Sequence, residues 1–219
     1  ATAQSVFAYP YPSNETAYID IRAENMGGDH NEVWKYTSGT DAVRITDSLP
    51  IGGTFRDYAV ASAVTYFYFI RAVNADSSYL QSATSSAVST FMGFWMHAAA
   101  KNDSNNAIVA PVLLNAVPPQ QRPVSRETEF QSAPSRTRMI AATGEAVIRQ
   151  WSVPIYSPVR ALTDATTLED FAALKQTLCF RDGGGRLMFG TLEMLPISYG
   201  VTPQIQLNLT ETDYREAIV

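Results

Sequence analysis

The stretch Val64-Thr-Tyr-Phe-Tyr-Phe-Ile-Arg-Ala-Val-Asn74 decides the fold, because aromatic and β-branched residues fill most of its positions. Residues of these types favour extended strands, so we predict a strand from Thr65 to Val73. Turn-forming residues follow it at Asn74-Ala-Asp-Ser-Ser78, where short polar side chains bond to their own backbone. A strand that ends in such a cluster is typical of an all-β domain.

Towards the N-terminus, short runs of the same kind are separated by the turn formers Gly27-Gly28, Ser38-Gly39 and Gly52-Gly53. Within Ala17–Ala23, alternate residues are apolar, so one face of this strand points into a core. Roughly seven strands at roughly ten-residue spacing predict a β-sandwich. The expected strands are Ser5–Tyr9, Ala17–Ala23, Glu32–Tyr36, Ala42–Ile45, Gly53–Val60, Thr65–Val73 and a last run that closes at Val88.

The segment Thr54-Phe-Arg-Asp-Tyr58 and the strand that follows it resemble strands E and F of a fibronectin type III domain. The resemblance implies that the Tyr66 hydroxyl bonds to the backbone at the preceding turn, as a tyrosine corner. An isoleucine stands where the family usually has a tryptophan in its second strand, and we expect Trp34 to supply the missing bulk in the core. Residues 1–90 are therefore predicted to form a fibronectin type III-like β-sandwich.

The composition narrows the classes of function. The 219 residues are 46% apolar and 17% charged, and the formal net charge is -5. No basic patch stands out, so we expect no nucleic-acid binding. No apolar run is long enough to cross a bilayer, so we expect no membrane insertion. A single cysteine cannot form an internal disulfide, so the fold does not depend on one.

The beginning of the chain, Ala1-Thr-Ala, shows no basic segment before an apolar one. We therefore expect no secretory signal there. These residues either follow a removed initiator methionine or continue a longer polypeptide.

The second half of the chain predicts a β-rich domain with one short α-helix. Thr166-Thr-Leu-Glu169 places a hydroxyl three residues before a carboxylate, which is a helix-start signal. An apolar stripe follows, so we expect a helix at about 166–178 that covers a sheet. The stripe consists of Leu168, Phe171, Ala172, Leu174 and Leu178.

Strands are predicted on both sides of this helix. Asp182-Gly-Gly-Gly185 predicts a hairpin turn between strands at 178–181 and 187–192. In the final strand Ile205, Leu207 and Leu209 alternate with polar residues and are expected to face inward. We predict a strand at 146–153 that ends at Pro154, and a polar loop or arm at 122–138.

The segment Cys179-Phe-Arg-Asp-Gly-Gly-Gly-Arg186, with Gly190, Leu192 and a last strand that runs into Thr210-Glu-Thr-Asp-Tyr214, resembles the C-terminal domain of minor tail proteins from phages of actinobacteria. Gly93, Trp95 and His97 match an opening strand of that family. The resemblance implies that residues 91–219 form a tail-assembly domain. It also implies a non-enzymatic virion protein, made in the host cytoplasm and located in the tail tip or baseplate at the distal tail.

The same resemblance implies how such a protein works. It would self-associate around the tail axis as a ring-like homo-oligomer, with other tail proteins as partners. The type III domain would then be a spacer or a surface decoration.

No group of residues predicts catalysis, a cofactor or a metal site. His30 lies in a glycine-rich loop and His97 ends an apolar run, so ligands for zinc are scarce. The run Gly183–Gly185 lacks the Lys-Ser/Thr of a phosphate-binding loop. Cys179 has no histidine near it in sequence and is interpreted as a small core residue. Two carboxylate pairs are interpreted as structural and not as a glycosidase pair: Glu169/Asp170 and Glu211/Asp213.

Arginines in the arm and the hairpin are predicted to lie at a subunit interface, because an arginine fork binds carboxylates with two hydrogen bonds. The hairpin charges can cross-link the turn to itself or reach a neighbouring subunit, or they form weak ion pairs on an exposed hairpin. The predicted interface residues are Arg122, Arg126, Arg136, Arg138, Arg181, Asp182 and Arg186.

A second hypothesis is an adhesion module that binds a cell-envelope glycan. Trp34, Tyr36, Tyr66 and Tyr79 supply aromatic rings that could stack on sugars. Aromatic rings in the core would favour a scaffold, whereas rings along one exposed groove would favour an adhesin.

Overall fold

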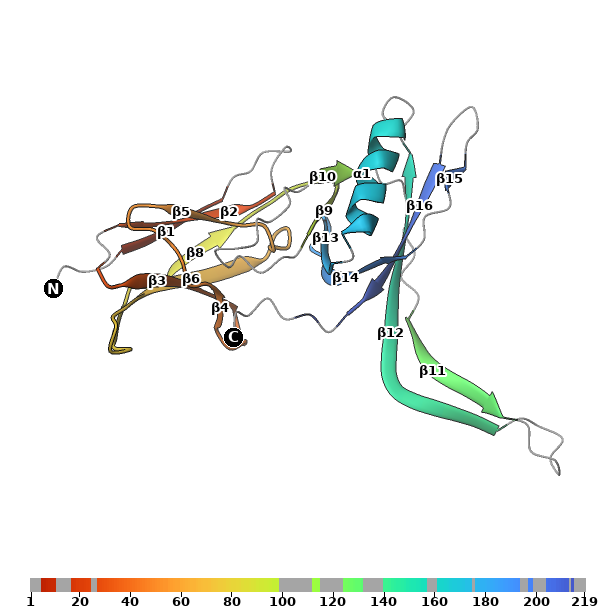
Figure 1. Cartoon of the computed structure of the whole chain (residues 1–219), viewed down its shortest axis with the longest axis horizontal. Coiled ribbons are helices and arrows are strands. Elements are labelled where there is room, and N and C mark those ends of the chain that lie inside the picture. Colours follow the sequence, from red (N-terminus) through yellow and green to blue (C-terminus); the bar gives the residue numbers. More distant parts are fainter. Residues whose placement is uncertain are drawn as a thin grey trace. The chain divides into compact units, whose positions relative to one another are not determined.

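The chain divides into two compact units, each described below by itself. The computed structural model describes residues 5–10, 17–24, 27–98, 112–114, 124–131, 140–156, 161–174, 176–193, 197–198, 204–212 and 214 (Figure 1). Unit 1 comprises Ala1–Asn115, Gln176–Phe189 and Asp213–Val219, and unit 2 comprises Ala116–Lys175 and Gly190–Thr212. The boundary predicted near Thr90 therefore falls inside unit 1.

Unit 1 contains the two sheets of a β-sandwich. The first sheet has the order β1-β2-β5, from β1 (Ser5–Pro10), β2 (Ile19–Glu24) and β5 (Thr54–Asp57). The second has the order β4-β3-β6-β7, and β8 also pairs with β6. Its strands are β4 (Val43–Thr46), β3 (His30–Thr37), β6 (Thr65–Val73), β7 (Tyr79–Gln81) and β8 (Ser85–Val88). All described pairings within the two sheets are antiparallel.

One hydrophobic core lies between these sheets. Alternate residues of each strand point to the same face, and the inward ones come from both sheets. This arrangement confirms the predicted β-sandwich. The core consists of Ile19, Ile21, Val33, Ile45, Leu49, Phe55, Val60, Tyr66, Tyr68, Ile70 and Ala87.

Trp34 does not supply core bulk, so that prediction is wrong. Val33 is fully buried in the core, and the neighbouring Trp34 therefore lies on the opposite face of β3. Its indole is stacked on Phe69, another residue of that outer face. Tyr68 and the two isoleucines of β2 fill the core instead.

The tyrosine corner is confirmed. The Tyr66 hydroxyl accepts a hydrogen bond of 2.9 Å from the backbone N–H of Ala61, in the loop that connects β5 to β6. This bond ties the beginning of β6 to the loop before it. Since both groups are buried, the bond also satisfies a backbone donor that water cannot reach.

The rest of unit 1 is a set of antiparallel strands. β9 (Phe94–Ala98) pairs with β10 (Val112–Leu114) on one side and with β13 (Leu178–Asp182) on the other. Every residue of β9 and β13 is buried. β14 (Leu187–Glu193) follows β13, and its first three residues belong to unit 1.

Unit 2 is built around the long strand β12 (Ile140–Tyr156). Its first part pairs with β11 (Val124–Gln131), and Gln150–Tyr156 pairs with β16 (Gln204–Glu211). β16 also pairs with the end of β14 and with β15 (Ile197–Ser198). Ile205, Leu207 and Leu209 of β16 are buried, as predicted.

Strands in this unit differ from the prediction in two places. The segment predicted as a polar loop or arm at 122–138 contains β11, which forms an antiparallel ribbon with β12 (Figure 1). Pro154 does not end a strand but lies inside β12, opposite Gln206. A proline fits there because, within the described residues, only β16 pairs with this part of β12, so the missing N–H belongs to the other edge.

The helix α1 (Ala161–Ala173) begins and ends five residues before its predicted bounds of 166 and 178. Thr166 and Thr167 lie in its middle and do not cap it, and Leu178 belongs to β13. Leu168 and Phe171 are buried, but Leu174 and Ala172 are exposed. The buried stripe is therefore shorter than the predicted one.

Gly190 allows β14 and β16 to approach closely. A Cβ atom at this position would lie 2.3 Å from the carbonyl oxygen of Thr210. Real side chains do not tolerate such a contact, so any other residue would push the two strands apart. Gly190 therefore has a structural role in the pairing of β14 with β16.

We expect Tyr66→Phe to lower the free energy of unfolding by about 1–2 kcal/mol, because the buried Ala61 N–H loses its acceptor. Tyr79→Phe is the matched control: Tyr79 is 52% exposed, and surface changes of this kind cost less than about 0.5 kcal/mol. Chemical denaturation of both variants measures the difference. Equal stabilities of the two variants would show that the corner bond contributes little.

Candidate functional site

The hairpin between β13 and β14 is held by Asp182. One carboxylate oxygen accepts hydrogen bonds from the backbone N–H groups of Gly184 (2.9 Å) and Arg186 (3.0 Å). The other oxygen lies 2.7 Å from Nε of Arg186. Gly185 adopts a φ of 84°, which only glycine adopts readily. Asp182 and Arg186 therefore cross-link the turn to itself, which is the first of the predicted roles.

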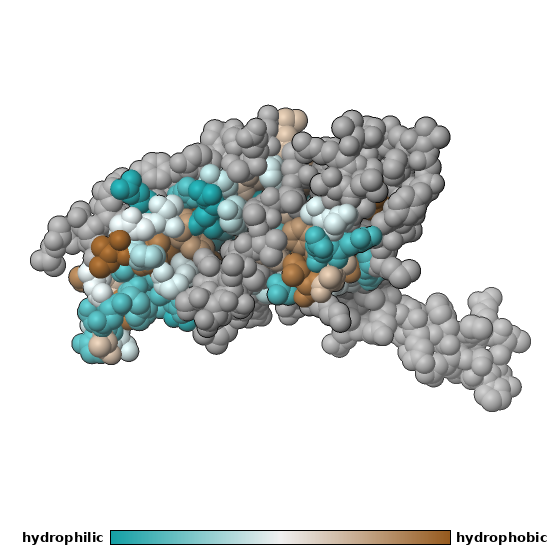
Figure 2. All heavy atoms as spheres, turned by 45° about the horizontal axis from the view of Figure 1, so that its top comes forward, coloured by the Kyte–Doolittle hydropathy of each residue, from teal (hydrophilic) through white to brown (hydrophobic). Residues whose placement is uncertain are grey.

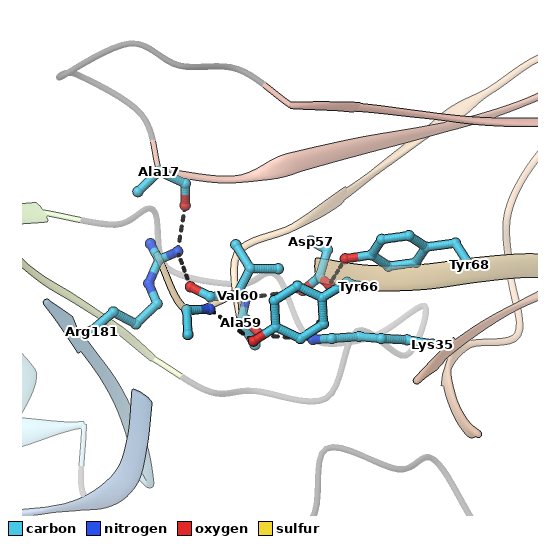
Figure 3. Close-up of polar contacts among 9 residues, drawn as sticks. Ala17, Lys35, Asp57, Ala59, Val60, Tyr66, Tyr68 and Arg181 are labelled. Atoms are coloured by element: carbon cyan, nitrogen blue, oxygen red, sulfur yellow. Dashed lines mark hydrogen bonds and ion pairs between the residues drawn. The ribbon is translucent and has the colours of Figure 1, made fainter. Parts of the chain in front are cut away.

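Arg181 is completely buried in unit 1. Its Nη1 donates hydrogen bonds to the carbonyl oxygens of Ala17, before β2, and of Val60 (3.2 Å), after β5 (Figure 3). The guanidinium also lies over the ring of Phe91, at 5.2 Å from its centroid. Burial lowers the pKa of Arg181, but a guanidinium keeps its proton in proteins. A buried cation therefore joins β13 to the two loops at one end of the sandwich.

Backbone contacts reinforce this junction. The Ser62 hydroxyl donates to the Phe91 carbonyl (3.1 Å) and accepts from the Phe91 N–H (3.2 Å). The N–H of Gly183 donates to the Gly93 carbonyl at 3.0 Å. A Cβ atom on Gly183 would lie 3.0 Å from the Phe91 carbonyl oxygen, a tight contact that glycine avoids. We call Arg181, Ala17, Val60, Ser62 and Phe91 the Arg181 junction.

A second buried charge lies inside the sandwich. Nζ of Lys35 is 3.0 Å from the Asp57 carboxylate and donates to the Ala59 carbonyl at 2.7 Å (Figure 3). Asp57 also accepts from the Tyr68 hydroxyl (2.8 Å) and from the Ala59 N–H (2.9 Å). Buried charges are stable when they are paired and hydrogen-bonded in this way. The cluster fixes the path of the chain after β5.

His97 and Cys179 are directly opposite one another in the pairing of β9 with β13. Their side chains therefore lie on the same face of the sheet, although they are far apart in sequence. Both are buried, which confirms the core interpretation of Cys179, but a histidine does lie across from it. Burial lowers the pKa of His97 well below its ordinary value, and the charges of Arg181 and Lys35 lower it further.

The outer face of the β4-β3-β6-β7 sheet carries a continuous row of aromatic rings with one arginine. Tyr36 is stacked on Phe67, with 5.0 Å between centroids, and Trp34 is stacked on Phe69 at 5.9 Å. The guanidinium of Arg71 lies over the rings of Trp34 (4.2 Å) and Tyr79 (4.5 Å). We call this set the outer row: Trp34, Tyr36, Phe67, Phe69, Arg71 and Tyr79.

Glu32 orients the tryptophan of the outer row. Its Oε2 accepts from Nε1 of Trp34 at 2.8 Å, and its Oε1 pairs with Nη1 of Arg44 at 2.7 Å. Glu32 is directly opposite Arg71 in the register of β3 and β6. Both of its oxygens are nevertheless used by other partners. The indole is therefore held in one orientation by the protein itself.

The described surface shows no broad apolar patch on the face drawn in Figure 2, where brown hydrophobic atoms lie between teal and white ones. Ile51, Leu80 and Met92 are large hydrophobic residues that are more than half exposed. Isolated exposed hydrophobic residues of this kind are ordinary on protein surfaces. The outer row is the more distinctive surface feature, because it combines ring faces with a cation.

The structure places the predicted interface residues in different environments. Arg122, Arg136 and Arg138 lie outside the described residues, and Arg126 lies in β11 without a described side chain. Arg181 and Asp182 are buried within one copy of the chain, so we take both out of the predicted interface. Arg186 is partly exposed but pairs with Asp182.

The aromatic residues predicted to stack on sugars also divide. Tyr66 is a core residue, whereas Trp34, Tyr36 and Tyr79 belong to the outer row. Sequence reasoning did not identify Arg71, Phe67 or Phe69 as part of a site. Their positions could have indicated this, since the three residues occupy alternate positions of β6 and therefore share one face of the sheet.

The buried Lys35–Asp57 pair was also missed. Lys35 is two residues after the core residue Val33, so strand alternation places it on the inward face. A lysine at an inward position indicates a buried acidic partner.

The described parts of the chain contain neither a candidate metal site nor a candidate membrane-spanning helix. There, no cluster of three or more His, Cys, Asp or Glu side chains could hold a metal ion. No helix in these parts is long and apolar enough to cross a membrane.

Comparisons with family models, with curated proteins and with solved structures each find no match to this chain. The resemblance to phage minor tail proteins therefore stays a prediction from the residues that carry it.

We expect Arg181→Ala to lower the free energy of unfolding of unit 1 by about 3 kcal/mol or more. The substitution leaves two buried carbonyl oxygens without a donor and a cavity in their place. Arg186→Ala is the control from the same hairpin: its side chain is 44% exposed and Asp182 keeps its two backbone donors, so we expect a smaller loss of about 1–2 kcal/mol. Chemical denaturation measures both losses, and equal losses would contradict the anchoring role of Arg181.

The buried His97 predicts a loss of stability in acid. Its pKa is lower in the folded state than in the unfolded chain, so the folded state favours the neutral ring. The contribution of His97 to the free energy of unfolding is fully present above about pH 6.5. It decreases by about 1.4 kcal/mol for each pH unit below that value. Unfolding free energies on both sides of this pH test the prediction. We expect His97→Gln to flatten the acid-side slope, whereas the control His30→Gln, at an exposed residue, keeps it.

Proposed function

We propose that this chain is a structural protein of a phage tail tip or baseplate, without enzymatic activity, that self-associates around the tail axis. In this role the sandwich of unit 1 serves as a spacer or surface decoration. The observation that carries the assembly part of the proposal is the ribbon of β11 and β12 in unit 2. The tail location is supported by the sequence resemblance alone.

The ribbon has an open edge among the described residues. Among the strands that the structure describes, β11 is the last in its sheet order and pairs only with β12. A terminal strand offers unpaired N–H and C=O groups to another chain. A two-stranded hairpin is also marginally stable in water without further packing. Both properties fit an arm that is completed by a strand or surface of a neighbouring copy.

The segment that resembles tail proteins has internal structural roles, which fits a scaffold. Arg181 anchors the sandwich loops, Asp182 closes the turn, and Gly190 allows the approach of β16. Each of these residues is used for packing or for hydrogen bonds within the chain. These structural roles support the proposal that the segment stabilises the fold and does not carry out catalysis.

Removal of the ribbon tests this proposal. We expect the full chain to form a closed oligomer in light scattering, and a variant with residues 124–147 replaced by a short flexible linker to be monomeric but folded. The linker keeps the part of β12 that pairs with β16, so unit 2 retains its described core.

A tip-shortened variant is the matched control. Gln131 and Ile140 are paired, so Asn-Gly in place of residues 132–139 would close the ribbon with a two-residue turn. This variant keeps the β11 edge and should still assemble. A monomeric full chain, or an oligomer that survives removal of the ribbon, would contradict the proposal.

A further inference from the structure

We propose that the outer row is a binding site for a saccharide that carries a carboxylate. The Arg71 guanidinium takes the carboxylate, and the Tyr79 ring stacks on the sugar. This inference goes beyond the assembly role and does not depend on it, because the site lies on the sandwich of a single chain.

The Arg71 guanidinium contacts three aromatic rings and a side-chain amide. Trp34 and Tyr79 lie within 4.2 Å and 4.5 Å of it, and Phe69 lies at 5.4 Å. Its Nε donates to the side-chain oxygen of Gln81 at 3.1 Å. Rings and amide together orient the two terminal NH₂ groups before any ligand arrives. Such preorganisation reduces the entropy lost on binding.

These terminal groups have no acceptor within the described residues. Glu32 is the cross-strand neighbour of Arg71, but its two oxygens bind Trp34 and Arg44. The only described hydrogen bond of Arg71 is the one from Nε to Gln81. An arginine fork with two free N–H groups matches a carboxylate with two parallel hydrogen bonds. The chain as a whole has a net charge of -5. An anionic ligand is therefore attracted to Arg71 and not to the rest of the protein surface.

The groups around Arg71 favour a sugar as the carrier of that carboxylate. Tyr79 is 52% exposed, so part of its ring is accessible beside the guanidinium. The C–H groups of a pyranose are weakly positive and are attracted to the negative face of an aromatic ring. Exposed Gln81 and Ser86 add uncharged hydrogen-bonding groups at the border of the row. Ser86 is opposite Phe67 in the pairing of β8 with β6, on the same face.

Titration with carboxylated oligosaccharides tests the proposal. The probes are oligogalacturonate, a hyaluronan oligosaccharide and sialyllactose, each compared with its counterpart in which the carboxyl groups are reduced to hydroxymethyl groups. The readouts are the dissociation constant and the NMR signal of the Trp34 indole N–H, assigned with Trp34→Phe. We expect at least one acidic probe to shift this signal, and its reduced counterpart to bind at least about tenfold more weakly.

Variants separate the site from general charge effects. Arg71→Gln should weaken binding of the acidic probe by about tenfold or more, and Tyr79→Ala by about fivefold. Arg149→Gln is the control, since it removes the same charge from a half-exposed arginine of unit 2 and should leave binding unchanged. Because Tyr79 is exposed, its truncation leaves the fold intact, which an unchanged unfolding temperature would verify.

Two results would overturn the inference. One is that no acidic probe shifts the Trp34 signal. The other is binding that is equal for acidic and reduced probes, or that falls as much in Arg149→Gln as in Arg71→Gln. Neither result bears on self-assembly, which is measured without saccharide.

Discussion

The burial of a single guanidinium organises unit 1. Arg181 lies in a strand that is contributed from late in the sequence, yet its donors bind carbonyl groups of Ala17 and Val60, which are 164 and 121 residues away. Desolvation of a charge is costly; within the described residues it is offset in part by the two carbonyl acceptors of Nη1 and by the Phe91 ring, while Nε and Nη2 have no hydrogen-bond partner. The consequence is that the sandwich and the strands β9 and β13 form one unit. The position near Thr90, where the sequence changes character, lies within this unit.

Local patterns predicted the parts of the fold that depend on local physics. The bounds of β6 were predicted to the residue, and the alternation in β2 and β16 identified core residues, because burial on one face of a strand imposes a period of two. Tyr66 was placed by its resemblance to a known corner. The helix was misplaced because Thr166-Thr-Leu-Glu169 has the pattern of a helix start, whereas the helix continues from an earlier turn.

Long-range interactions are the part that the sequence could not provide. A charged residue next to a glycine-rich turn is ordinarily exposed, and Arg181 was accordingly predicted to lie at a subunit interface. Only the pairing of β13 with β9 brings it against the sandwich loops. The same pairing brings His97 opposite Cys179. At the outer row, sequence reasoning selected Trp34, Tyr36 and Tyr79 as rings, but the cation between them required the register of β3, β6 and β7.

The two faces of the β4-β3-β6-β7 sheet carry different sets of residues. The inner face builds the core with the Lys35–Asp57 pair, and the outer face presents rings and Arg71 to solvent. A scaffold protein can carry such a surface without any change in its core, since outward residues alternate with inward ones along each strand. The proposed assembly through the β11–β12 ribbon and the proposed recognition through the outer row therefore do not depend on each other.

Native-state hydrogen exchange tests the central claim, that β9 and β13 belong to the folding unit of the sandwich. If the Arg181 junction joins them, amides of Met96 and Phe180 should open only with the same free energy as amides of β6, such as Ile70. The predicted result is that the opening free energies of the β9, β13 and β6 amides decrease in parallel as denaturant is added. Exchange of β9 and β13 through a lower-energy opening, while β6 stays protected, would contradict the account.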